Sequence, residues 1–186
     1  MDLRVQRTKR NIAEAFIELR KEKSLEKITV TELAQKACIN KATFYLHYQD
    51  IYDLSEQLEN EALDKLLNDM SYPNNFVENP KQAYNELTEA VTKPDTLVSI
   101  LFSGNRKTVL EEKLEIVLKE RTYQANPHFR DNLLIDLVLS VLIHGGFHTF
   151  LAYTEKGEEE KQKQVVDILG NINEHLLNYY LYGKKD

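Results

Sequence analysis

The side chains best suited to chemistry lie close together between residues 41 and 48, in the run KATFYLHY. Lysine, threonine, tyrosine and histidine supply hydrogen-bond donors, and a small alanine among them lets the backbone approach a large partner closely. Such groups are suited to phosphate oxygens and to base edges in the major groove of DNA. The candidate contacts in this run are Lys41, Ala42, Thr43, Tyr45, His47 and Tyr48.

Two short predicted helices, over residues 30–37 and 41–48, position this run. Thr29 and Glu32 have the spacing of a capping box, and Asn40 is a suitable cap for the second helix. Helices this short are stable only when other helices pack against their apolar side chains. A first helix over 3–21 and the start of a helix over 51–70 can supply this packing. Two short helices joined by a tight turn are typical of a helix-turn-helix, whose second helix enters the major groove.

On these residues the chain resembles the TetR/AcrR family of bacterial transcriptional regulators. The resemblance covers residues 5–58, through RTKRNIAEAFIEL and ITVTELAQKACINKATFYLHYQDIYDL. The segments LFSG and HGGFHTFLAYTEKG are similar to a C-terminal domain of some of these regulators. The resemblance implies that Thr31 contacts phosphate, that residues 41–48 read DNA, and that Arg4, Arg7 and Lys9 reach the DNA backbone from an N-terminal arm.

Two positions depart from the pattern of that family. Cys38 occupies the turn where the family usually has glycine, which predicts a less relaxed backbone there. Ile51 stands where the family usually has lysine at the start of the fourth helix, so one phosphate contact is absent or is replaced by Tyr52 or by the helix N-terminus, which Asp50 caps.

The charge of the 186-residue chain is divided unevenly. Its formal net charge is −6, which by itself argues against a nucleic-acid partner. Residues 1–49 nevertheless hold ten basic and six acidic side chains, a charge of +4, and the remainder carries −10. A basic head on an acidic body predicts two separate tasks.

Gly and Pro are absent from the first seventy residues, and no segment alternates apolar and polar residues as a strand would. We therefore expect an all-α fold of about nine helices. The predicted domains are a DNA-binding helix-turn-helix over 1–50 and an effector-binding and dimerisation domain over 51–186, with 51–70 as a connecting helix. Pro73 and Pro80 bracket a polar connection between the two.

Two long predicted helices, over 127–153 and 158–182, carry broad apolar stripes. Such stripes exceed what one small domain can bury, which predicts a homodimer formed through these last two helices. The longest apolar run, 133–143, is shorter than the roughly 20 residues that span a bilayer, and the N-terminus is not that of a signal peptide. With a single cysteine in the chain, we expect no disulfide, no membrane and a cytoplasmic location.

The body offers several candidate effector contacts that combine aromatic rings with polar groups. They are Phe102, Arg106, Tyr123, His144, Phe147 and His148. His144 and His148, four apart, could hold a metal, but no third ligand is evident, and histidines packed at a dimer seam are the simpler interpretation. No cofactor is expected.

We find no P-loop, nucleophile elbow or dinucleotide fingerprint, so an enzyme is not expected. The sequence predicts a DNA-binding regulator that a small molecule releases from a pseudo-palindromic operator, and the family resemblance implies a repressor. The alternative is a helical adaptor that works through protein contacts and keeps a degenerate DNA-binding head.

Overall fold

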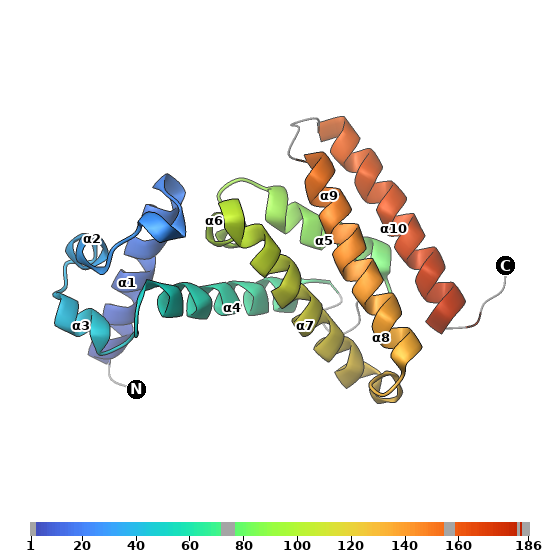
Figure 1. Cartoon of the computed structure of the whole chain (residues 1–186), viewed down its shortest axis with the longest axis horizontal. Helices are drawn as coiled ribbons and strands as arrows, with labels where there is room; N and C mark the ends of the chain where they lie inside the picture. Colours follow the sequence, from blue (N-terminus) through green and yellow to red (C-terminus); the bar gives the residue numbers. More distant parts are fainter. Residues whose placement is uncertain (1–2, 72–76, 155–158, 182, 184–186) are drawn as a thin grey trace. The chain divides into compact units, whose positions relative to one another are not determined.

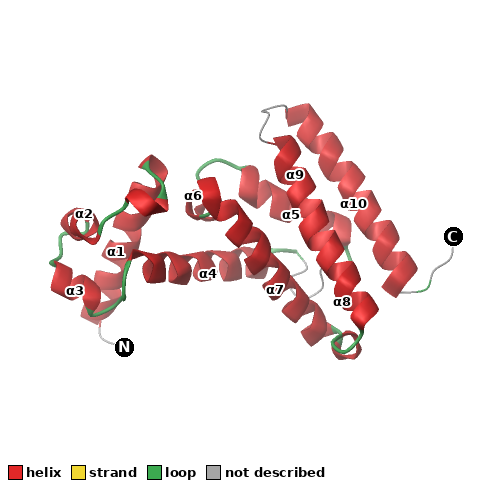
Figure 2. Cartoon of the chain, viewed as in Figure 1, coloured by secondary structure: helices red, strands yellow, loops and turns green. Residues whose placement is uncertain are grey.

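The computed structural model describes residues 3–71, 77–154 and 159–181 together with Gly183. Over these residues the chain forms helices and connecting loops and no strand, as Figure 2 shows. The predicted all-α fold class is confirmed. The predicted connection residue Pro73 lies outside the described residues.

Figure 1 shows the helices in chain order. The α-helices are α1 (Leu3–Glu22), α2 (Val30–Lys36), α3 (Lys41–Tyr45), α4 (Ile51–Asp69), α5 (Pro80–Thr92), α6 (Leu97–Leu101), α7 (Lys107–Ala125), α8 (Leu133–Ser140), α9 (Gly146–Thr154) and α10 (Glu159–Leu181). Short 3₁₀ turns are η1 (Leu25–Lys27), η2 (Gly104–Arg106) and η3 (Pro127–Phe129), and η4 (Val141–Gly145) is a π-helical turn. Because α8, η4 and α9 are continuous, the described residues form nine separate α-helices, the predicted number.

The chain divides into two compact units. Unit 1 comprises Met1–Asp64 and Pro94–Arg106, and unit 2 comprises Lys65–Lys93 and Lys107–Asp186. Unit 1 therefore contains the predicted head, most of α4, and the later segment with α6 and η2. This division coincides neither with the predicted limit at residue 50 nor with the polar connection that ends at Pro80, because unit 1 continues into α4 as far as Asp64 and because α6 packs against α1.

Side-chain caps fix the helix starts of unit 1. The Thr29 hydroxyl accepts from the Glu32 amide, as predicted, whereas the Glu32 carboxylate pairs with the Lys23 ammonium instead of returning to the cap. The Asp50 carboxylate accepts from the Asp53 amide at 2.8 Å. Caps of this kind satisfy amides that have no partner inside the helix.

Two predicted helix bounds need correction. The helix predicted over residues 41–48 ends at Tyr45, because the chain turns at Leu46 and His47. The helix predicted from residue 127 begins at Leu133. Pro127 starts only the short turn η3, and Asn132 accepts from the amides of the first turn of α8.

Unit 2 is built around α5, which packs against both α9 and α10. Two glycines permit this close packing. A methyl group at Gly146 would lie 3.3 Å from the Tyr84 ring, and one at Gly170 would lie 2.9 Å from the Lys81 side chain. The Tyr84 hydroxyl donates to the Gly146 carbonyl at 2.8 Å, so α5 is tied to the start of α9.

The helical segment Leu133–Tyr153 has the length and the mean hydropathy, 1.7, of a helix that could cross a membrane. This segment is longer than the apolar run on which the prediction of no membrane was based. Of its most apolar stretch, 39% is buried inside the structure, and core helices of soluble proteins pass the same test. The absence of a membrane partner therefore stays a prediction.

Cys38 gives a direct test of the turn between α2 and α3. Its φ is 55°, in the left-handed region that costs a residue with a Cβ about 1–2 kcal/mol. Cys38→Gly removes this cost, but glycine also gives the unfolded chain more conformational entropy, which offsets part of the gain. We therefore expect a net increase of about 0.5–1 kcal/mol in the free energy of unfolding, measured in urea. Because Cys38 is exposed, Cys38→Ala is the matched control, and an equal gain from alanine would contradict the backbone explanation.

Candidate nucleic-acid interface

One buried ring determines which face of α3 is exposed. Phe44 is 0% exposed and is the buried residue of this five-residue helix. Tyr48, which was among the predicted DNA contacts, is instead buried in the core, with its ring centroid 5.6 Å from that of Phe44. Asn40 fixes the helix start because its side chain accepts from the Thr43 amide at 2.7 Å. The remaining side chains of α3 therefore face outward.

The outward face carries most of the predicted DNA contacts. Lys41, Ala42 and Tyr45 are exposed, and Thr43 and His47 are partly exposed. The Tyr45 ring, 56% exposed, stands edge-on to Phe44, so the core of the head orients it. The donors Lys41, Thr43 and Tyr45 all lie on the five-residue helix α3, and His47 follows in the next turn of the chain, a spacing suited to one stretch of DNA backbone and groove.

Leu46, which follows α3 directly, is missing from the predicted contacts. It is 80% exposed, beside the exposed Tyr45. An exposed aliphatic side chain at the end of a reading helix can contact a thymine methyl group. Sequence reasoning missed it because the predicted helix continued to Tyr48, and a leucine inside a helix is expected to be buried.

The other predicted contacts lie on neighbouring helices of the same unit. Thr31 is exposed on the first turn of α2. Arg4 and Arg7 are exposed, and Lys9 lies 5.7 Å from the Tyr48 ring centroid. These three residues belong to α1, which begins at Leu3, so the described chain holds them on a helix and not on an extended arm.

The two departures from the family pattern have distinct structural consequences. Cys38 adopts the positive φ that the turn requires, and the Ile39 amide still donates to the Ala34 carbonyl at 3.0 Å. Ile51 is buried at the start of α4, so it contributes to the core of the head and offers no charge to a phosphate. The exposed Tyr52 amide is already bonded to the Asp50 carboxylate.

The segment that contains α6 and η2 contacts α1 and α4 within unit 1. The buried Arg20 guanidinium of α1 donates to the Leu101 carbonyl at 3.1 Å and to the Ser103 hydroxyl at 2.9 Å. Arg106 makes a bidentate pair with the fully buried Glu59 of α4, because its Nε donates to one carboxylate oxygen at 3.0 Å and its Nη2 to the other at 2.7 Å. A buried pair of this kind is costly to break on one side, because the other charge then lacks compensation.

Two predicted effector contacts therefore have structural partners inside unit 1. Phe102 is buried, and the Arg106 guanidinium is held by Glu59. The other four predicted effector residues, Tyr123, His144, Phe147 and His148, lie in unit 2. The structure thus distributes the predicted set between two compact units.

In unit 2, polar side chains recur at every fourth residue along two helical segments that face each other. On α7 these are Glu111, Glu115, Lys119 and Tyr123, and on the continuous α8–α9 segment they are Asp136, Ser140, His144 and His148. The Tyr123 hydroxyl donates to Asp136 at 2.7 Å, and Lys119 donates to Asp136 at 2.7 Å and to Ser140 at 2.6 Å. We call this arrangement the polar ladder.

Glu115 is the central acceptor of the polar ladder. The Ser140 hydroxyl donates to it at 2.6 Å, Lys119 lies 3.0 Å away, and His144 Nε2 lies 2.5 Å from its other oxygen. The Ser140 hydrogen bond above all, with those of Lys119 and His144, outweighs burial and lowers the pKa of Glu115 from its usual 4.5 to about 2. His148, whose side chain is mostly exposed, lies 3.8 Å from Glu111.

Phe147 lines a small apolar cavity in unit 2 with a volume of about 20 Å³. A cavity of that size holds little more than one water molecule. The lining residues are Tyr84, Leu87, Leu114, Leu118, Leu142, Ile143 and Phe147. An effector at this position would first have to open the packing around the π-helical turn.

No group of three or more histidine, cysteine, aspartate or glutamate side chains in the described parts of the chain is arranged to hold a metal ion. Comparison with protein-family models and with curated proteins found no match for this chain.

The lowered pKa of Glu115 predicts a pH dependence of stability. A carboxylate whose folded pKa lies below its unfolded value stabilises the fold fully above about pH 4.5 and loses this contribution as the pH falls towards about 2. We expect Glu115→Gln to lower the free energy of unfolding by about 1–3 kcal/mol at pH 7, and by progressively less below pH 4.5. Urea unfolding of both proteins across this range tests it, and a difference independent of pH would contradict it.

Proposed function

We propose that this protein is a homodimeric DNA-binding transcriptional regulator of the kind that residues 5–58 resemble. The observation that carries the proposal is the outward face of α3, where Lys41 and Tyr45 are exposed while the buried Phe44 and the Asn40 cap hold the helix in place. A short capped helix with donors on one side and a core residue on the other is suited to the major groove.

Electrostatics support the same proposal. The excess of positive charge lies in residues 1–49, and the exposed Lys41, Arg4 and Arg7 belong to the same compact unit. The remaining chain carries the negative excess, which would repel DNA and favour contact through the head. Phosphate contacts of this kind make binding strongly dependent on salt.

A dimer is favoured by an uncovered apolar face on unit 2. The helices α8 and α10 pack against each other and expose large apolar side chains. Those on α8 are Leu133, Leu134 and Leu137, followed by Val141 at the start of η4, and those on α10 are Ile168, Ile172, Tyr179 and Tyr180. Pairing of two copies about a two-fold axis would cover both stripes and present two heads to a pseudo-palindromic site.

Regulation by a small molecule is the remaining part of the proposal. The helix α4 belongs to both compact units, since its residues up to Asp64 lie in unit 1 and those from Lys65 lie in unit 2. A ligand that shifts the end of α4 would act on a helix that also forms part of the DNA-binding unit. The family resemblance implies that the regulator represses transcription, and the composition predicts a cytoplasmic location.

An adaptor that binds protein in place of DNA is the alternative, and two observations favour it. Ile51 is buried where a phosphate-binding lysine would be useful, and Leu46 adds exposed apolar surface beside α3. Protein contacts through an apolar patch depend little on salt, whereas DNA contacts through lysines depend on it strongly. Salt dependence therefore separates the two functions.

A fluorescence anisotropy titration of the full chain with DNA from upstream of its own gene tests the regulator. We expect specific binding that weakens at least about tenfold between 50 and 200 mM salt. Lys41→Ala with Tyr45→Ala should abolish specific binding without lowering the melting temperature appreciably. Lys65→Ala removes an exposed charge from unit 2 and is the matched control. Unchanged affinity of the double variant would refute this reading surface.

The dimer has its own test in light scattering coupled to size exclusion. Leu137→Glu introduces a charge in the centre of the proposed interface and should weaken dimerisation by at least about a hundredfold, or about 3 kcal/mol. Ile116→Glu is the matched control, because Ile116 is also an exposed aliphatic residue, 68% exposed against 53% for Leu137, but lies on α7. Monomeric wild-type protein, or equal effects of both variants, would exclude the proposed interface.

A further inference from the structure

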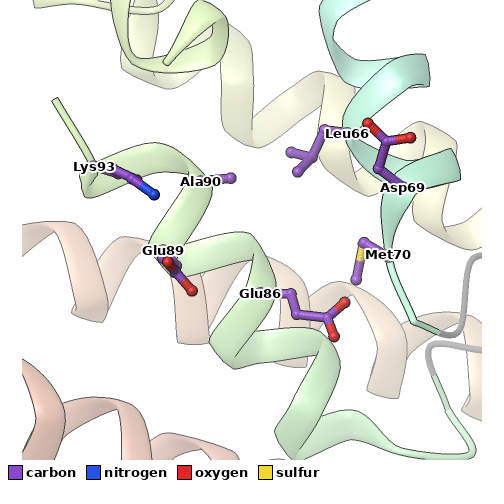
Figure 3. A pocket seen from close by; sticks show the side chains of 7 residues that line it. All are labelled: Leu66, Asp69, Met70, Glu86, Glu89, Ala90 and Lys93. Carbon is purple, nitrogen blue, oxygen red and sulfur yellow. The ribbon is translucent and has the colours of Figure 1, made fainter. Parts of the chain in front are cut away.

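A groove in unit 2 lies between the last turn of α4 and the second half of α5 (Figure 3). Its volume is about 250 Å³, far larger than the apolar cavity beside Phe147. The lining residues are Leu66, Asp69 and Met70, followed by Glu86, Glu89, Ala90 and Lys93. The second group recurs at the three- and four-residue spacing that places side chains on one face of a helix.

The floor of the groove is apolar and adaptable. Leu66, Met70 and Ala90 supply it, and all three are wholly or partly buried. Methionine has a flexible, polarizable side chain that adjusts to ligands of different shape. The volume is slightly below the roughly 300–1,000 Å³ typical of sites for drug-sized molecules, so the groove fits a small ligand.

The rim of the groove is acidic. It carries three carboxylates, from Asp69, Glu86 and Glu89, against the single ammonium of Lys93. Asp69 and Glu89 are exposed, and Figure 3 shows them on opposite sides of the groove. The local charge is therefore negative over an apolar floor, which complements a ligand with one positive charge and an apolar body.

Glu86 is held as an acceptor at the inner edge of the groove. The Ser71 amide donates to it at 3.0 Å and the Ser71 hydroxyl at 2.5 Å, and Gln82 adds a bond at 3.0 Å. Burial opposes ionisation, but these hydrogen bonds outweigh it and lower the pKa of Glu86. The carboxylate thus stays charged at neutral pH, with its geometry fixed by Ser71, which follows α4, and by Gln82 on α5.

We propose that this groove binds a small organic cation, such as a substituted ammonium ion with an apolar body, as an effector of the protein. The carboxylates of Asp69, Glu86 and Glu89 face the charge, and the side chains of Leu66 and Met70 cover the apolar part. The inference rests on the proposed function only for its consequence, namely that occupancy changes DNA binding. Binding of the cation itself is independent of that function.

The inference can be tested by isothermal titration calorimetry on the full chain with benzyltrimethylammonium. We expect a Kd below about 1 mM, with weaker binding of tetramethylammonium, which lacks the apolar body, and no binding of benzenesulfonate, which has the opposite charge. Asp69→Asn with Glu89→Gln should weaken binding at least tenfold. Ala90→Leu, which fills the floor and keeps every charge, should also weaken it.

The matched control is Glu112→Gln with Asp131→Asn, which removes two exposed carboxylates of unit 2 that lie outside the groove. Its affinity for the cation should stay within twofold of wild type. An equal loss in this control would show attraction to net charge alone and would overturn the site. Absence of binding, or equal binding of benzenesulfonate, would overturn it as well.

The consequence for regulation is measured by repeating the DNA titration with saturating cation. A fall of at least fivefold in DNA affinity, absent in Asp69→Asn with Glu89→Gln, supports the effector role. Specific DNA binding without cation binding overturns this inference alone. Cation binding by a chain that binds no DNA overturns the proposed function and the effector role, and leaves the cation site.

Discussion

The burial of Phe44 is the contact on which the proposed DNA-reading surface depends. A five-residue helix has almost no stability of its own, so α3 exists only because tertiary packing holds it. The fully buried ring fixes the rotation of the helix, and the Asn40 cap fixes its start. Lys41 and Tyr45 are exposed as a consequence of these two constraints, and no property of their own determines where they point.

The packing around that helix extends beyond the first fifty residues. Unit 1 includes a segment from the middle of the chain, Pro94–Arg106, which Arg20 and Glu59 hold through carbonyl and carboxylate contacts. The segment is joined covalently to α5 and α7 of unit 2, so the two units share three chain crossings. In a regulator this connectivity would provide the route by which a ligand affects the head, in addition to the shared helix α4.

Local signals made much of the structure predictable from the sequence. The caps Asn40 and Asp50, the pair Asn79 and Pro80, and the number of helices depend on a few neighbouring residues, and the structure confirms them. The sequence could not show that Glu59 pairs with Arg106, because such a contact depends on tertiary packing across 47 residues. The polar ladder was hidden for the same reason. The four-residue spacing of its polar side chains is visible in the sequence of each helix, but the relative position of the two helices, which brings Glu115 next to His144, is not.

We propose that the outward face of α3 reads DNA sequence as part of a two-fold dimer. The most direct measurement is selection of duplexes from a random pool by the full chain, followed by sequencing of the bound fraction. We expect enrichment of one pseudo-palindrome, with its two halves separated by about one helical turn or somewhat more. Recovery of a pool without enriched sequence, or of a single unrepeated half-site, would contradict it.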